Sequence, residues 1–475
     1  MRSHQSIAQH YWMPLAIVLL VAGVNYGFAF HYPFFVADDW DWLYSAQFSS
    51  YRDLAVLWPR AVYNDRPVGA LVIKFIYQLF GLRSEAFYLF QLGIHVFNCL
   101  LLFWIAKRYI SVGGAFLAAV LAGTWVIAND AVIWTAAIFD LFGATLCLFS
   151  IYLWQIGKRN QNTWFVILGA IVYFLAIRTK EFAITLPLLI FAMAILLEGE
   201  SWKSALKRLW PYWLVMGILG VWYLHLLIKS PYIGGNDAYS LHIAGVWSNL
   251  IYYFDALFYE NLWDPRRSVW HKVHQALYVI SIACLAYAIW VSNNYRKVLI
   301  VSIWGFLLLL GPTLLLKNHL GELYLYAPHF FLAFGIGGLF STNRLLRWPV
   351  ILLAGLLVFW PLSTQWYGDK ANFYISHIQD TLDQHRSFQK HLLNILPGTH
   401  IYIANIGEWN SFDVQEGKPL KVMKQDSTLK LLAHMPDQQL STLFCQDSDS
   451  KIYILMDGNQ AIDQTRKINA QCGDR

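Results

Sequence analysis

Eleven long apolar runs limit what this chain can fold into more than any other feature of its sequence. Charged residues make up only 13% of the 475 residues and hydrophobic residues 57%, whereas a soluble domain carries about 25% charged residues. A helix needs about 20 apolar residues to cross the hydrocarbon core of a bilayer. We therefore expect an α-helical polytopic membrane protein with about eleven transmembrane helices. The runs lie near residues 12–31, 87–106, 113–128, 131–155, 163–177, 182–198, 210–228, 274–292, 298–316, 323–341 and 348–366.

The runs divide the chain into two expected domains. Residues 1–368 form a transmembrane domain, interrupted by two long loops at 32–86 and 229–273, where we expect interfacial or short helices. Residues 369–475 have ordinary soluble composition and predict a small α/β domain. Its expected elements are a helix over 372–396, ended by Pro397-Gly398, and two strands over 400–405 and 451–456. Cys445 and Cys472 could pair if this domain lies outside the cell.

Lysine and arginine fix the expected orientation. With the N-terminus in the cytoplasm, every inner hairpin is basic, as the positive-inside rule requires. The two long loops and the C-terminal domain then lie outside a bacterial inner or plasma membrane. The net charge of +6 is thus explained by topology, and no nucleic-acid partner is expected. The inner basic residues are Lys107, Arg108, Lys158, Arg159, Lys203, Lys207, Arg208, Arg296, Lys297, Arg344 and Arg347.

The first outer loop carries two candidate motifs. Asp38 and Asp39 follow the first run, and one of them could serve as a base while the other binds a donor or metal. The alternative is a solvated helix N-cap, a position that aspartate favours. Arg66-Pro67 opens an amphipathic stretch, and the guanidinium suits a phosphate. The alternative, a helix start with Pro67 at its first position, is compatible with that role.

Two further motifs place charges at the outer membrane edge. Lys180 and Glu181 precede the run at 182–198, and they would meet a phosphate or a substrate at the mouth of a cavity, or else snorkel to the interface. In the segment 317–326, Lys317 and His319 could form an anion site, and Glu322 and Tyr324 are further candidates for binding the substrate. The alternative is a charged helix end that complements the helix dipole. Charged residues kept at membrane depth generally serve a function.

No dedicated metal motif stands out. His271 and His274 are three residues apart but lack a third ligand. We assign no metal ligand, and a divalent cation stays open as a cofactor because carboxylates and a donor phosphate would suit one.

These motifs together resemble those of the GT-C superfamily of membrane glycosyltransferases, which use lipid-phosphate sugars. The acidic pair Asp38-Asp39 lies in the first outer loop, as in that family. The stretch from Arg66-Pro67 to Arg108 is similar to the "RPL…hGl…hHlvNhllH" region of bacterial and TMTC-like members. Lys180-Glu181 begins a span. The sequence GELYLYAP at 321–328 looks like the "ERYLYLPS" segment, with Leu323 where arginine is usual and His329 where serine is usual.

The resemblance implies a transfer of sugar from a polyprenyl-phosphate carrier to a hydroxyl of a lipid, glycan or protein acceptor at the outer face. It implicates Asp38 or Asp39 as the catalytic base, with Arg66, Lys180 and Lys317 stabilising the departing phosphate. Lys317 or His319 could replace the missing arginine. The main alternative is a polytopic transporter or a flippase for lipid-linked sugars, which would show inverted repeats and charges near mid-bilayer. The glycosyltransferase hypothesis requires the motifs to converge on one outward-facing cavity.

Overall fold

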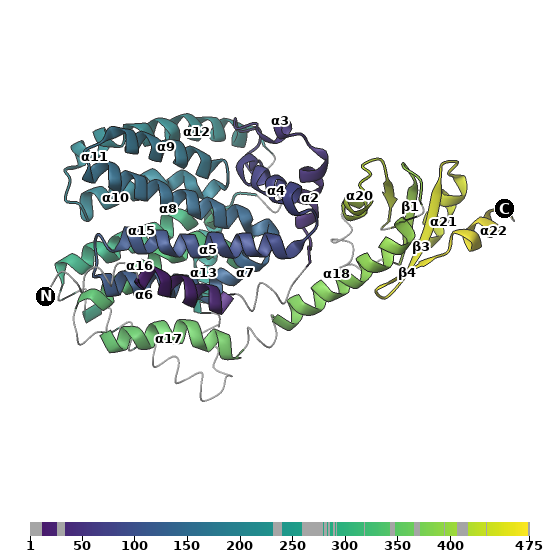
Figure 1. The fold of residues 1–475 in the computed structure, drawn as a ribbon. Helices are drawn as coiled ribbons and strands as arrows, with labels where there is room; N and C mark the ends of the chain where they lie inside the picture. The colour runs from purple at the N-terminus through teal and green to yellow at the C-terminus, as the bar shows by residue number, and fades with distance from the viewer. Residues whose placement is uncertain are drawn as a thin grey trace.

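The computed structural model describes residues 12–25, 34–230, 240–258, 292–317, 319–342, 347–364, 371–393, 395–405, 417–433 and 435–473, with isolated positions between 279 and 290. Figure 1 shows a bundle of long, roughly parallel helices, from which a long helix leads to a small domain containing the C-terminus. The expected α-helical membrane domain and its α/β tail are therefore both present.

The bundle helices follow the apolar runs. Five described helices are long and apolar enough to cross a membrane: Ser84–Ala106, Thr135–Arg159, Trp210–Ile228, Asn293–Leu314 and Glu322–Thr342. The described helices match ten of the eleven predicted runs, and the run at 274–292 lies almost wholly outside the described residues. The bundle helices are Trp12–Asn25, α5 (Ser84–Ala106), α6 (Val112–Thr124), α7 (Asn129–Ile133), α8 (Ile138–Arg159), α9 (Thr163–Ile177), α10 (Leu186–Leu196), α11 (Trp202–Arg208), α12 (Trp210–Ile228), α13 (Val246–Phe258), α15 (Asn293–Leu314), α16 (Tyr326–Thr342) and α17 (Arg347–Thr364).

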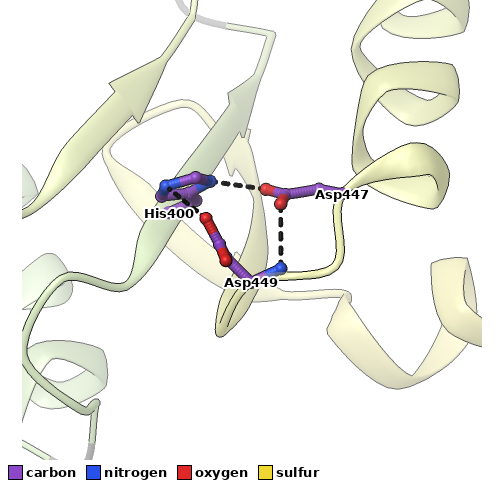
Figure 2. Close-up of side chains that lie close together, drawn as sticks. All are labelled: His400, Asp447 and Asp449. Atoms are coloured by element: carbon purple, nitrogen blue, oxygen red, sulfur yellow. Dashed lines mark hydrogen bonds and ion pairs between the residues drawn. The ribbon is translucent and has the colours of Figure 1, made fainter.

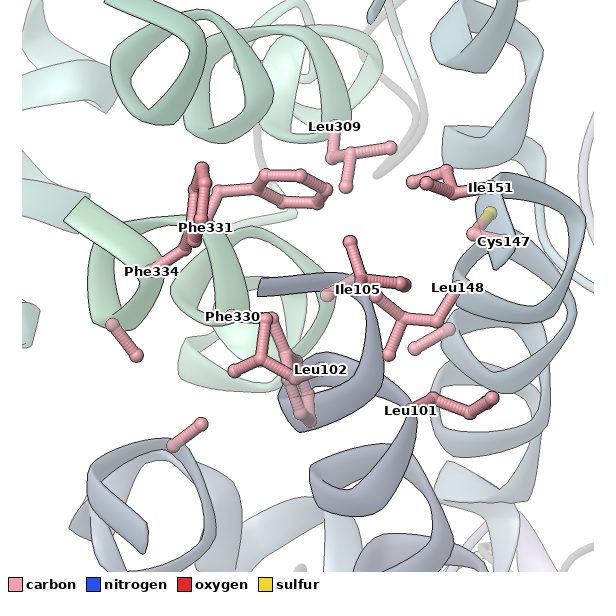
Figure 3. Packing of buried hydrophobic residues seen from close by; sticks show 14 of the residues in the cluster. Leu101, Leu102, Ile105, Cys147, Leu148, Ile151, Leu309, Phe330, Phe331 and Phe334 are labelled. Carbon is pink, nitrogen blue, oxygen red and sulfur yellow. The ribbon is translucent and has the colours of Figure 1, made fainter. Parts of the chain in front are cut away.

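Side chains from several helices interlock at the centre of the bundle. Figure 3 shows leucine and isoleucine of α5 meeting Cys147, Leu148 and Ile151 of α8, beside phenylalanines of α16. Helices α6 and α16 approach most closely at Gly114 and Gly337, where a Cβ on either glycine would lie 2.3 Å from the carbonyl oxygen of the other. Small residues allow such close packing between membrane helices.

Short 3-10 turns lead into several helices at one end of the bundle. They are η1 (Val126–Ala128), η2 (Thr135–Ala137), η3 (Glu181–Thr185), η4 (Ile243–Gly245) and η5 (Glu322–Leu325). The prediction of one continuous span from residue 131 is wrong at its start, because α8 begins only at Ile138. Before it, α7 and η2 form a separate turn whose Ala136 N–H donates to the Asp39 carboxylate over 2.6 Å.

The first loop folds into α2 (Asp39–Phe48), α3 (Tyr51–Leu54) and α4 (Pro67–Phe80). The predicted amphipathic helix is confirmed in α4, which begins with proline as expected. It buries Ile73 and Ile76 and exposes Phe75, Leu79 and Phe80. In the second long loop the described part contains η4 and α13, as the expectation of short helices required.

The tail confirms the predicted helix and both predicted strands and adds elements that were not predicted. Its order is α18 (Ala371–Leu392), β1 (His400–Ala404), α20 (Lys418–Lys424), β2 (Lys430–Leu432), α21 (Asp437–Gln446), β3 (Lys451–Asp457), β4 (Gln460–Asp463) and α22 (Thr465–Gly473). The sheet order is β2-β1-β3-β4, and only the β3–β4 pair is antiparallel. A disulfide joins Cys445 of α21 to Cys472 of α22.

Candidate functional site

Four charged side chains from distant parts of the sequence meet at the end of the bundle that carries the 3-10 turns. Lys180 Nζ donates to Asp140 Oδ2 over 2.8 Å. Arg66 donates through Nε and Nη2 to the two carboxylate oxygens of Glu181, over 3.1 and 3.2 Å. Their side chains are only 2% (Asp140) to 20% (Glu181) exposed. We call these four residues the site cluster.

Aromatic rings flank both cations of the site cluster. The Arg66 guanidinium lies 5.5 Å from the ring centre of Phe139, and Lys180 Nζ lies 5.0 Å from that of Tyr324. Cations over ring faces at this range are attracted by the ring quadrupole, more so where water is excluded. Tyr324 was predicted as a site residue, and the structure places its ring beside the lysine.

A buried arginine holds the turn that presents Arg66. Arg178, whose side chain is 0% exposed, donates to Asp65 and to the Tyr223 hydroxyl, each over 2.7 Å. Asn64 takes the left-handed conformation, with φ of 59°, which asparagine tolerates better than most residues. The chain thus reverses before Pro67 and aims the Arg66 side chain at Glu181.

Asp38 has a carboxylate near the site cluster that makes no hydrogen bond or ion pair with any described residue. It stands at the N-cap position of α2 but makes no side-chain cap hydrogen bond, and no described residue pairs with its half-buried carboxylate. Burial and then the neighbouring Asp41 raise the pKa of Asp38, while Arg66, Lys180 and Lys418 pull the pKa down. The N-cap alternative raised for Asp38 therefore has no capping bond to support it.

Asp39 has a different environment. Its side chain is 1% exposed and accepts the N–H of Ala136 over 2.6 Å and that of Val36 over 3.0 Å. The preceding Ala37 has φ of 49°, which is costly for a residue with a Cβ. These two hydrogen bonds hold the strained turn at Ala37 next to η2. Asp39 thus fixes the backbone at Val36 and at Ala136.

The predicted segment 317–326 reaches the site through some of its residues. The His319 ring lies 5.8 Å from that of Tyr324, and burial, then the positive charges of Lys180 and Arg66, lower the pKa of His319. Glu322 begins η5, and the Lys317 N–H donates to the Ser240 carbonyl over 2.8 Å. The structure therefore brings Arg66, Lys180, Glu181, His319 and Tyr324 together, with Asp38 in electrostatic range.

Asp140 is the site residue that the sequence analysis missed. It lies inside the apolar run at 131–155, which was interpreted only as a span. The available signal was an acid in the first turn of a helix, where it complements the dipole, at the same end of the bundle as Lys180.

A second polar cluster lies in the tail, where His400, Asp447 and Asp449 bring three potential ligand atoms within 4.8 Å (Figure 2). His400 Nδ1 lies 2.6 Å from Asp447, and the Tyr402 hydroxyl donates to the same oxygen over 2.7 Å. Although burial opposes it, hydrogen bonds from Tyr402, the Asp449 N–H and His400 lower the pKa of Asp447 to about 2. Protein donors thus occupy the Asp447 carboxylate, and Asp449 is 62% exposed.

This second cluster fastens the turn before β3 against β1, and we assign it no metal. His271 and His274, weighed above as metal ligands, lie outside the described residues.

Comparison with known proteins adds a family. The family model for dolichyl-phosphate-mannose-protein mannosyltransferases matches residues 64–228, about a third of the chain, which include the whole site cluster. No curated protein sequence matches significantly.

Two solved structures that resemble this chain have very different sequences from it. ArnT from Cupriavidus metallidurans, bound to undecaprenyl phosphate, is 14% identical over 93% of both chains, with a TM-score of 0.50. The oligosaccharyltransferase of Archaeoglobus fulgidus, tethered to an acceptor peptide, is 11% identical over 94% of this chain and 69% of its own, with a TM-score of 0.46. Residues 64–228 are thus similar to that mannosyltransferase family, and the chain as a whole shares the fold of ArnT.

Proposed function

We propose that this protein transfers a sugar from a polyprenyl-phosphate carrier to an acceptor hydroxyl at the outer face of the membrane. The observation that carries the proposal is Asp38, a half-buried carboxylate with no partner among the described residues, beside two buried cations. We place the lipid groove and the binding sites for donor and acceptor in residues 1–368. The tail at 369–475 forms a second domain, outside the cytoplasm.

Asp38 is the proposed base. As the acceptor oxygen bonds to the anomeric carbon, Asp38 takes the hydroxyl proton, and the bond from the anomeric carbon to the phosphate oxygen breaks. The electron pair leaves with the lipid phosphate. Burial raises the pKa of Asp38, which brings its proton affinity closer to what a general base at neutral pH needs. Asp39 supports this base by fixing the turn.

The site cluster can receive the departing phosphate. A lysine has three N–H donors and an arginine five. Lys180 uses one on Asp140 and Arg66 uses two on Glu181, so each retains donors. Preorganised donors in a site that excludes water stabilise developing negative charge strongly. Lys317, His319, Glu322 and Tyr324 are proposed to complete the donor site, with any divalent cation unassigned.

Two features support an outer location. The Cys445–Cys472 disulfide suits an oxidising compartment, which a tail outside the cytoplasm would occupy. Lys158 and Arg159 end α8 at the opposite end from Asp140, so the basic turns lie away from the site, as expected of a cytoplasmic side. The lipid phosphate bound to ArnT supports a lipid carrier here as well.

Asp38→Asn provides the test. In proteoliposomes with a labelled polyprenyl-phosphate sugar, we expect transfer to fall by about 10²- to 10⁴-fold, the usual contribution of a general base. The matched control is Asp383→Asn, an acid in the tail that is 61% exposed, which should transfer normally.

The donor is identified in a deletion strain, where the unused polyprenyl-phosphate sugar accumulates and is detected by mass spectrometry. The acceptor is sought among the surface glycans of the same strain. Full transfer by Asp38→Asn would refute Asp38 as base. Movement of the intact lipid-linked sugar across the bilayer without transfer would favour the flippase.

A further inference from the structure

The soluble tail contacts the loop that carries the proposed base. Helix α20 of the tail lies against α2 of the membrane domain (Figure 1). This contact joins residues almost 380 positions apart in the sequence, because Lys418 pairs with Asp41.

The contact has an apolar part that is well buried. Val422 of α20 is 1% exposed and belongs to the same buried cluster as Trp40 and Leu43 of α2. From α18, the His385 ring lies 4.8 Å from that of Trp40 and 5.2 Å from that of Phe34. Buried side chains from both domains therefore fix α20 on α2, rather than leaving it on a free tail.

Basic residues of α20 face the exposed side of α2. The Lys418 ammonium donates to the Asp41 carboxylate. About one helical turn further along both helices, Lys421 Nζ lies 5.8 Å from the ring centre of Tyr44. Residues three apart in a helix share one side, so Asp41 lies on the side of α2 that continues from Asp38. Lys418 is thereby placed beside two carboxylates, of which it neutralises one.

We propose that Lys418 is a positioning residue of the transfer site, because its ion pair with Asp41 offsets a negative charge that acts on Asp38 and holds α2 in register. The inference rests on the proposed function. If Lys418 has this role, the tail contributes a residue to the transfer site.

The charges around Asp38 come from four places. Asp41 of α2 raises the pKa of Asp38, after burial, while Arg66 before α4, Lys180 before η3 and Lys418 of α20 lower it. Removing Lys418 takes away one lowering charge and exposes Asp38 to the full charge of Asp41. The pKa of Asp38 must then rise, and the base becomes protonated at a higher pH.

The experiment measures kcat/KM against pH for the full-length protein in proteoliposomes. Lys418→Met should move the acid limb of the profile to higher pH, because the variant loses a positive charge that lowers the pKa of Asp38. The plateau at higher pH should be retained. Asp41→Asn should move the limb down, and the double variant Lys418→Met/Asp41→Asn should return it toward the wild-type position.

The matched control is Lys424→Met, which removes a lysine of the same helix whose ammonium donates only to the Leu393 carbonyl among the described residues. Its acid limb should stay in place. An unmoved limb in both Lys418→Met and Asp41→Asn, or an equal loss of activity at every pH, would overturn the inference. If Lys418→Met does not fold, Asp41→Asn gives the test with the opposite sign.

The two proposals fail separately. Loss of transfer in Asp38→Asn, together with unshifted profiles in the Lys418 and Asp41 variants, removes only the positioning role. Full transfer by Asp38→Asn removes the proposed base, whatever the profiles show.

Discussion

The two ends of α8 can be compared directly, because each carries a charge cluster. Asp140 lies in the first turn of α8 and Lys158 in its last turn, about 27 Å away at 1.5 Å per residue. At the far end, Glu198 meets Arg108 at 2.6 Å and Lys158 at 3.0 Å, while Glu200 meets Lys158 at 2.8 Å and Arg208 at 3.4 Å. We call these five residues the distal cluster.

The clusters differ in how completely their acids are used. In the distal cluster each carboxylate contacts two cations, and Glu198 also accepts the Tyr109 hydroxyl over 2.9 Å. In the site cluster each acid has one cationic partner, and Asp38 nearby has none among the described residues. Ion pairs alone therefore do not identify a functional site. Spare donors and an open acid in a buried setting distinguish the candidate site from the distal cluster.

The largest expected effect comes from Lys180→Met. It leaves the buried Asp140 without its cation, so unfolding in detergent should become easier by about 3–5 kcal/mol and sugar transfer should be lost. The variant Lys180→Met/Asp140→Leu replaces the pair by apolar side chains and should recover stability without recovering transfer. Recovery of transfer in the double variant would show that the site cluster, like the distal one, only holds helices together.

A smaller effect is expected from Glu198→Gln in the distal cluster. The change removes a charged acceptor of Arg108, Lys158 and Tyr109, and should lower the free energy of unfolding by about 1–3 kcal/mol. Transfer by the folded protein should stay within about twofold of wild type, measured in the same proteoliposomes. A hundredfold loss of transfer with normal stability would show that the distal cluster also serves sugar transfer, and would contradict the proposed difference between the two clusters.

The smallest effect should come from Arg208→Gln. Its side chain is 36% exposed and its pairing distance to Glu200 is 3.4 Å, so solvent already screens the pair. We expect the free energy of unfolding to change by less than about 1 kcal/mol, with transfer unaffected. Thermal unfolding in detergent measures it, and a loss as large as that of Lys180→Met would contradict the difference drawn between the two ends.

The same comparison shows what sequence can predict. Arg66, Lys180 and Glu181 were identified because each is a charge beside an apolar run. Asp140 escaped because one acid inside a long apolar run hardly alters its average character. The role of Asp140 depends on where α8 begins, and the turn just before that helix bonds to Asp39, 97 residues away in the sequence.

In the tail, α18, β1 and β3 were predicted because each has a long enough run of helix-forming or of apolar, β-branched residues. Strands β2 and β4 have only 3 and 4 residues, too few for a pattern of alternation. The docking of α20 on α2 could not be predicted, because local sequence says nothing of which distant surfaces meet.

That docking has a consequence for how such proteins can be recombined. A tail taken from a relative would bring its own counterpart of α20 to this α2, and Asp41 and Leu43 would lose Lys418 and Val422, their ion-pair partner and their neighbour in the buried cluster. Chimeras should therefore work when residues 39–48 are exchanged with the tail and fail when the tail is exchanged alone. The two helices would have to be exchanged together, although almost 380 residues separate Asp41 from Lys418 in the sequence.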